Sequence, residues 1–300
     1  MAARPGLERV RWDSAAAARL ALLVAVLVAG LWLRTLEPLN LGAAAWPWAG
    51  APTATLYFSH GGFLFPLSRR LPADGDLPRA ALEALMAGPP AGSPLQNPLP
   101  PGVALRSVRV EGGTAHVDLS APVDALQAAP LGLTAIVATM TRLPDISSVA
   151  LTADGVPLAP PAARAPLLYY PSSNGLVAVP TTHASPRAAL DAFLSGPPSS
   201  ELAGLPPDVR LLAYDTGADG RLSLEFSYTP SIRTLALERP DRMRFLLLGL
   251  IASLTEFPEV RAVRLDFGGQ TRLGLGECSD LLRTPQARPA LLNDERLLDW

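Results

Sequence analysis

The side chains that could carry chemistry in this chain are few and scattered. The 300 residues contain three histidines, His60, His116 and His183, and one cysteine, Cys278. Metal sites need clustered ligands at set spacings, and none of the three histidines has a histidine, cysteine or carboxylate partner at such a spacing. His116 alternates with apolar residues, so we expect it to point to solvent beside Asp118. We therefore predict no metal site and no cofactor.

A catalytic nucleophile is equally hard to find. The sequence contains neither a G-x-S-x-G turn nor a phosphate-binding loop. Cys278 follows Gly274 and Gly276, and we interpret it as a thiol without a catalytic role. A lone cysteine also excludes an intrachain disulfide. We predict no catalytic residues and expect that the protein is not an enzyme.

Composition points to a globular chain of ordinary charge. Hydrophobic residues make up 49% and charged residues 17%, with 25 basic side chains, all arginine, against 27 acidic ones. The net charge of −2 gives no basic excess to suit a polyanion, which argues against nucleic-acid binding. A length of 300 residues suits roughly two domains.

An internal repeat defines the architecture. Residues 79–90 read RAALEALMAGPP and residues 187–198 read RAALDAFLSGPP, with eight of twelve positions identical. Further pairs follow in the same order, Leu56-Tyr57-Phe58 with Leu168-Tyr169-Tyr170 and Leu99-Pro100-Pro101 with Leu205-Pro206-Pro207. What recurs is apolar faces and turns, with no recurring polar constellation. The Gly-Pro-Pro segments are interpreted as helix stops, because proline cannot continue a helix.

The elements within each copy follow from periodicity. The first copy predicts strands at 55–58 and 63–65, a helix ending before Gly88, a hairpin at 108–119, a helix around 133–140 and a strand at 148–152. The second copy predicts strands at 167–170 and 176–179, a helix from Pro186 capped by Ser185, a hairpin around 212–226, a helix around 243–254 and a strand at 262–267. The order β(β)αββαβ, twice, predicts an α+β class with two tandem small α/β sandwich modules, each a small sheet with two helices on one face.

An uncharged apolar run, LALLVAVLVAGLWL, occupies residues 20–33. With the preceding alanines it predicts a transmembrane anchor at 15–34, although a cleaved signal peptide ending near Ala43-Ala44-Ala45 is the alternative. Arginines in the tail 1–14 predict a cytoplasmic N-terminus and an extracytoplasmic bulk at the cell membrane. The predicted boundaries then run through a linker at 35–52, modules at 53–160 and 166–276, and a tail at 277–300 that packs on a neighbour or is ragged.

These motifs together resemble the GerM domain of sporulation and spore germination. The resemblance is carried by Leu56-Tyr57-Phe58, residues 81–90, 99–102 and 108–119, and Asp154-Gly155, and in the second copy by residues 168–170, 189–198 and 205–209. It implies a bacterial envelope protein, membrane-tethered or a lipoprotein, with tandem domains similar to ring-building modules. It also implies a role in assembly rather than catalysis. No lipobox cysteine follows the apolar run, so the run itself is the expected anchor.

Two functions remain open from the sequence. The first is a non-catalytic envelope scaffold that acts through protein–protein interaction, with envelope proteins or a second copy of itself as partner in a homo-oligomer. The alternative is a module that binds cell-wall polymer or a small ligand, with weak hydrolase activity. The alternative is motivated by Trp46, Trp48 and Tyr169-Tyr170, which equally fit a membrane-surface belt and a core strand.

Overall fold

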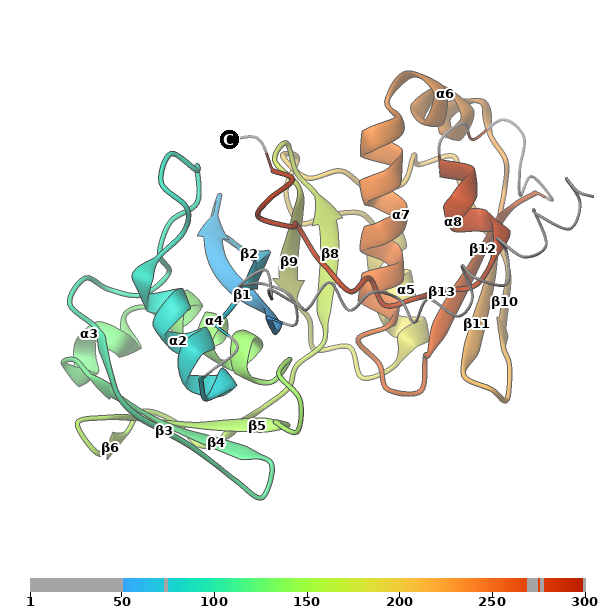
Figure 1. Cartoon of the computed structure of the whole chain (residues 1–300). Coiled ribbons are helices and arrows are strands. Elements are labelled where there is room, and N and C mark those ends of the chain that lie inside the picture. Colours follow the sequence, from blue (N-terminus) through green and yellow to red (C-terminus); the bar gives the residue numbers. More distant parts are fainter. Residues whose placement is uncertain (1–50, 73–74, 269–274, 276–277, 299–300) are drawn as a thin grey trace, which may run out of the picture. The chain divides into compact units, whose positions relative to one another are not determined.

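The computed structural model describes residues 51–72, 75–268, 275 and 278–298 (Figure 1). Residues Gly50–Trp300 form one compact unit. The predicted anchor at 15–34, its cytoplasmic tail and most of the linker lie outside the described residues. Among the helices that are described, none is long and apolar enough to cross a membrane.

The first copy contains two hairpins, each followed by helical structure. In chain order its elements are β1 (Thr53–His60), β2 (Phe63–Arg70), α2 (Leu77–Ala87), β3 (Ala104–Glu111), β4 (Thr114–Ser120), α3 (Val123–Gln127), α4 (Pro130–Met140), β5 (Ser148–Ala153), β6 (Val156–Pro157) and β7 (Ala162–Ala163). Helix α2 buries Ala81, Leu82 and Leu85 on one face. It stops before Gly88, whose φ of 94° is a conformation that glycine adopts without strain.

The second copy repeats this order up to its last parallel strand, β12, after which helix α8 and β13 follow in place of β6 and β7. Its elements are β8 (Leu167–Pro171), β9 (Leu176–Pro180), α5 (Pro186–Leu194), β10 (Leu211–Thr216), β11 (Arg221–Phe226), α6 (Pro230–Glu238), α7 (Pro240–Leu254), β12 (Ala262–Phe267), α8 (Ser279–Arg283) and β13 (Gln286–Ala287). The predicted cap of α5 is confirmed, because the Ser185 side chain accepts a hydrogen bond from the backbone N–H of Ala188 at 3.2 Å.

Each copy builds one sheet around its second hairpin. The orders are β3-β4-β5-β6, with β7 also paired to β5, and β10-β11-β12-β13. Strands β4 and β5 pair in parallel, as do β11 and β12. The helical segments between them supply the long crossover that a parallel pair requires. The predicted α+β class is confirmed.

The first hairpins of the two copies join one another. They form a third sheet in the order β1-β2-β9-β8, in which Leu64 of β2 pairs with Ala178 of β9 (Figure 1). The sequence predicts one small sheet for each module, whereas the first hairpins of both copies lie together in a separate sheet. Because each short hairpin alone is marginally stable, pairing across the copies gives both of them a four-stranded sheet. The two copies therefore share a core element.

Helices α4 and α7 cover the two edges of this shared sheet. The backbone N–H of Tyr57 in β1 donates to Thr139 Oγ1 of α4 at 3.2 Å, and that of Tyr169 in β8 donates to Ser253 Oγ of α7 at 2.8 Å. Helix α7 comes so close to β8 that a Cβ on Gly249 would lie 2.4 Å from the carbonyl oxygen of Tyr169. Edge strands that would otherwise invite pairing are thus closed by side-chain hydroxyls.

The C-terminal segment packs against both hairpins. Asn293, only 7% exposed, donates to the carbonyl oxygens of Pro66 and Leu176, both at 2.7 Å, and accepts from Leu176 N–H at 2.8 Å. Because Pro66 belongs to β2 and Leu176 to β9, one amide side chain bridges the two copies. The sequence left open whether residues 277–300 pack or form a ragged tail, and the described residues of this segment pack.

Candidate functional site

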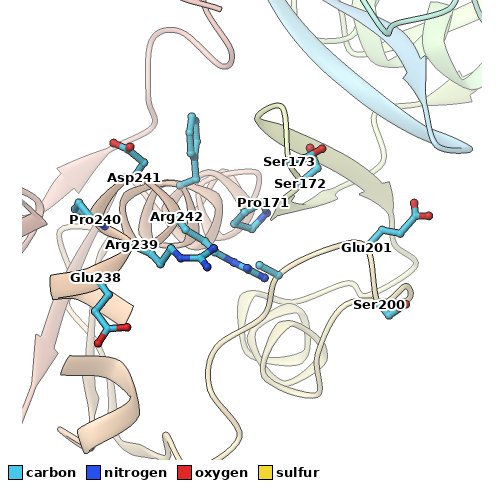
Figure 2. A pocket seen from close by; sticks show the side chains of 12 residues that line it. Pro171, Ser172, Ser173, Ser200, Glu201, Glu238, Arg239, Pro240, Asp241 and Arg242 are labelled. Atoms are coloured by element: carbon cyan, nitrogen blue, oxygen red, sulfur yellow. The ribbon is translucent and has the colours of Figure 1, made fainter. Parts of the chain in front are cut away.

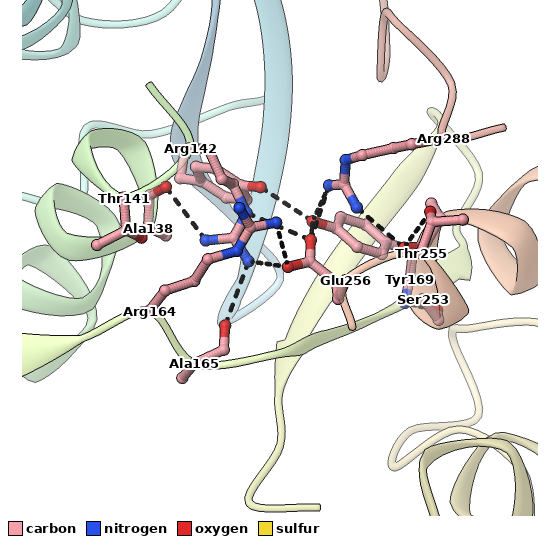
Figure 3. A network of polar contacts seen from close by, with 12 residues as sticks. Ala138, Thr141, Arg142, Arg164, Ala165, Tyr169, Ser253, Thr255, Glu256 and Arg288 are labelled. Atoms are coloured by element: carbon pink, nitrogen blue, oxygen red, sulfur yellow. Dashed lines mark hydrogen bonds and ion pairs between the residues drawn. The ribbon is translucent and has the colours of Figure 1, made fainter. Parts of the chain in front are cut away.

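A buried polar network lies where the two copies meet. Figure 3 shows Glu256, just after α7 of the second copy, among Arg142 of the first copy, Arg164 of the segment between the copies and Arg288 of the C-terminal segment. Its side chain is fully buried and forms ion pairs with Arg142 at 2.9 Å, Arg164 at 3.0 Å and Arg288 at 2.7 Å. It also accepts a hydrogen bond of 2.6 Å from the hydroxyl of Tyr169.

The network is built from equivalent positions of the repeat. Arg142 is the second residue after α4 and precedes Leu143-Pro144, and Glu256 is the second residue after α7 and precedes Phe257-Pro258. Opposite charges therefore occupy the same place in the two copies. The hydroxyls of the equivalent Tyr57 and Tyr169 lie 3.0 Å apart. Two copies meeting at equivalent positions would bring like side chains together, and the opposite charges remove that repulsion.

The arginines also close the ends of two helices. Arg142 Nη1 donates to the carbonyl oxygen of Ala138 in α4 at 3.2 Å, and Arg288 Nη1 donates to that of Ala252 in α7 at 3.0 Å. Cations are stabilised at helix C-termini, where carbonyls lack intrahelical partners. Three guanidinium groups face one carboxylate, and the partial negative charges at the C-terminal ends of α4 and α7 offset part of the remaining positive charge.

Electrostatics hold the network in one protonation state. Burial alone raises the pKa of Glu256, but the guanidiniums of Arg142, Arg288 and Arg164 outweigh it and lower the pKa to about 2. Burial also raises the pKa of Tyr57 well above its usual 10. A carboxylate that stays ionised and fully partnered cannot exchange protons near neutral pH. We assign these residues to stability.

A cavity of about 580 Å³ lies in the second copy (Figure 2). Three segments line it: the β8–β9 turn with Ser172 and Ser173, the loop after α5 with Ser200, and the junction of α6 and α7. At that junction Arg239 and Arg242 reach into the cavity, while Glu238 and Asp241, which also line it, extend away from the two guanidinium groups, and Glu201 lies on the opposite side (Figure 2). No signal of the internal repeat could have found this cavity, because the loops and helix ends that line it differ between the copies.

The histidines stay apart. His60 is the last residue of β1, and its ring packs edge-on against that of Phe65 with the ring centroids 5.9 Å apart. His116 is exposed on β4, as predicted, and His183 is exposed before α5. Asp118 accepts hydrogen bonds from Thr152 Oγ1 at 2.6 Å and Gly155 N–H at 2.9 Å. Within the described residues, no three His, Cys, Asp or Glu side chains come together as a metal site would need.

The other residues weighed for chemistry are buried or lie outside the described residues. Cys278 is buried outside any disulfide, and its Sγ donates to the carbonyl oxygen of Pro240 at 3.4 Å. Tyr169 and Tyr170 are buried, and Tyr170 stacks on Phe193 with ring centroids 4.8 Å apart. The interpretation of the tyrosine pair as a core strand is therefore right, and the pair offers no exposed face to a sugar. Trp46 and Trp48 fall outside the described residues.

Comparisons with known proteins agree with this fold. The tandem GerMN domains of the sporulation protein GerM from Bacillus subtilis are similar to this chain at a TM-score of 0.61 and 21% identity, over 82% of this chain and 99% of that one. The first GerMN domain of that protein, taken alone, gives a TM-score of 0.29 at 24% identity, over 35% of this chain and 85% of that chain. None of the curated proteins compared with the chain matches it.

A family model gives the decisive match. The family Germane, described as sporulation and spore germination, matches the chain twice, over residues 55–159 and 167–273. The two matches cover most of the chain and fall on the two copies of the internal repeat. The predicted resemblance is confirmed: the chain belongs to the Germane family of sporulation and spore germination, with its domain in tandem.

Proposed function

We propose that this protein is a non-catalytic scaffold or assembly protein of the bacterial cell envelope. It is held at the cell membrane by residues 15–34, with its N-terminus cytoplasmic and both Germane domains extracytoplasmic. It acts through protein–protein interaction, with envelope proteins or a second copy of the chain as partner. Family membership and the tandem fold support an assembly role, and the anchor and its orientation rest on the sequence alone.

The observation that carries the proposal is a free sheet edge in each copy. Strands β3 and β10 hold equivalent places, and β4 and β11 are the strands that pair with them among the described residues. Both strands are largely exposed. Each also exposes a large apolar side chain, Val110 at 41% and Leu212 at 57%. The edges of the shared sheet are covered by α4 and α7, whereas no strand in the described part of the chain pairs with the outer edge of β3 or β10.

An uncovered edge strand is a template for a further strand. Its outward N–H and C=O groups can pair with a partner's backbone, and its side chains then provide specificity. Each edge also has a register irregularity near its start, between Leu105 and Ser107 and between Leu211 and Ala213. Bulges and charges on an edge, such as Arg106 and Arg109 on β3, limit unspecific pairing. The two edges therefore favour pairing with specific partners over unspecific strand pairing.

The test is to place a charge on each edge. We expect Val110→Lys and Leu212→Lys in the full chain to reduce co-purification of cross-linked partners or of a second, differently tagged copy. The control is Leu297→Lys, because Leu297 is 78% exposed and lies on no strand. All three sites are exposed, so the free energy of unfolding should change by less than about 0.5 kcal/mol. Equal recovery of partners by the parent, both edge variants and the control would contradict the proposal.

The cavity of the second copy favours a second candidate, the binding of a small ligand or cell-wall polymer. That candidate no longer draws support from Tyr169 and Tyr170, which are buried. Its support comes instead from the arginines in the cavity.

A further inference from the structure

We propose that the cavity of the second copy binds the phosphate group of a phosphate-bearing ligand through Arg239 and Arg242. This inference is independent of the scaffold function, because it concerns a cavity away from strands β3 and β10. The segments that meet at the cavity are the β8–β9 turn, the loop after α5 and the start of α7.

The two arginines are available to a ligand. Both are exposed, and both reach into the cavity from the start of α7 (Figure 2). Neither forms an ion pair with a carboxylate among the described residues. Three acidic residues also line the cavity: Glu201 lies across it from the arginines, and the side chains of Glu238 and Asp241 extend away from the two guanidinium groups (Figure 2). Two guanidiniums one helical turn apart repel each other unless an anion lies between them.

The arginines belong to a part of the chain that the repeat does not require. Thr139 of α4 and Ser253 of α7 each accept a backbone hydrogen bond from an edge strand of the shared sheet. These two equivalent residues allow the helices to be aligned with each other. On that alignment α7, with 15 residues, extends about one turn beyond the start of α4, with 11. The extra turn carries Arg242, and Arg239 directly precedes it. Exposed side chains on an added turn contribute nothing to the common core, so the fold alone does not explain them.

A phosphate group suits the donors better than a carboxylate does. Guanidiniums pair with phosphate oxygens in a bidentate manner. The hydroxyls of Ser173 and Ser200 add further donors from the other two segments. Several donors around one cavity suit the three or four oxygens of a tetrahedral phosphate, whereas a planar carboxylate offers two.

The ligand is larger than a free ion. A cavity of about 580 Å³ falls within the size range of small-molecule sites. Phe245, Pro171 and Pro240 provide apolar wall beside the arginines. We therefore expect a phosphate carried on an organic group, such as a glycerol phosphate unit. Such a unit can belong to a cell-wall polymer or to a phospholipid headgroup.

The experiment measures dissociation constants for the full chain in an uncharged detergent by isothermal titration calorimetry. The probes are glycerol 1-phosphate, soluble poly(glycerol phosphate) and a short-chain phosphatidylglycerol below its micelle concentration. The test variant is Arg239→Gln/Arg242→Gln. The matched control, Arg109→Gln/Arg233→Gln, removes the same charge from two exposed arginines away from this cavity. Circular dichroism melts confirm that both variants fold.

The expected result is binding of glycerol 1-phosphate that weakens roughly tenfold or more in the test variant, as the loss of two charge-assisted contacts implies, and stays within about twofold in the control. Tighter binding of the polymer or of the lipid then identifies the source of the phosphate. Equal weakening in both variants would show unspecific charge attraction and overturn the proposal. Absence of binding by all three probes, or tighter binding of a matched carboxylate such as glycerate, would also overturn it.

Discussion

Replacing Glu256 by glutamine tests the polar network that joins the two copies. Glutamine keeps the size and one carbonyl oxygen but removes the negative charge that three arginines share. Arg142 has a side chain only 7% exposed and would keep its positive charge without a counter-charge. An unpaired buried charge is among the most costly defects that a substitution can create.

The structure gives the magnitude of this effect in two ways. Removing one partner of a buried ion pair costs about 3–5 kcal/mol. Independently, the fall in the pKa of Glu256 from 4.5 to about 2 corresponds, at about 1.4 kcal/mol for each pH unit, to about 3 kcal/mol of stability at neutral pH. Both routes predict a loss of about 3 kcal/mol or more in the free energy of unfolding for Glu256→Gln.

The effect must depend on pH in a defined direction. Because the pKa of Glu256 is lower in the folded protein, its contribution is fully present above pH 4.5 and is lost as the pH falls toward 2. The parent protein should therefore lose its advantage over Glu256→Gln progressively between pH 4.5 and pH 2. Above that window the difference should stay constant.

Urea unfolding of the full chain, followed by circular dichroism at several pH values, measures the difference. The control is Glu83→Gln, because Glu83 pairs with Arg79 on the surface and has a side chain 58% exposed. Its loss should stay below about 0.5 kcal/mol. If Glu256→Gln stays within about 1 kcal/mol of the parent at pH 7, the network does not stabilise the junction as argued.

Three further outcomes follow from the same structure. Tyr169→Phe should cost about 2 kcal/mol in urea unfolding and Tyr57→Phe about 1, because of the two tyrosines only Tyr169 donates to the carboxylate of Glu256; equal losses would contradict this. Gly249→Ala should lower stability by about 2 kcal/mol, because its Cβ would lie 2.4 Å from a carbonyl oxygen; the usual gain of alanine in a helix would refute the close approach. Cys278, which is 0% exposed, should react with a thiol reagent only at the rate of unfolding, and rapid labelling of the native protein would show otherwise.

Much of the fold could be predicted from the sequence, because local rules define it. The helix stops at Gly88 and Gly196, the Ser185 cap and the alternating hairpins all have local causes, and the structure shows each of them. Helix α6 was not predicted, although Thr229 followed by Pro230 is a start signal, and the Thr229 side chain accepts from Ile232 N–H.

The joining of the two copies could not be predicted in the same way. Pairing of β2 with β9 depends on residues more than a hundred positions apart, and periodicity assigns each hairpin only to its own copy. Opposite charges at the equivalent Arg142 and Glu256 were the one available hint. The arginines of the cavity were not predicted because they lie at an extra helical turn that only the second copy has. A comparison of the two copies identifies only the features that both share.

The most direct test of the assembly role is photo-cross-linking in living cells. A photoreactive amino acid at Val110 on the free edge of β3 should form specific covalent adducts with an envelope protein or a second copy of the chain. The same group at Leu297, which is more exposed but lies on no strand, should form none of these adducts. Identical adducts from both positions, or none from Val110, would contradict the claim that the tandem domains act through their free sheet edges.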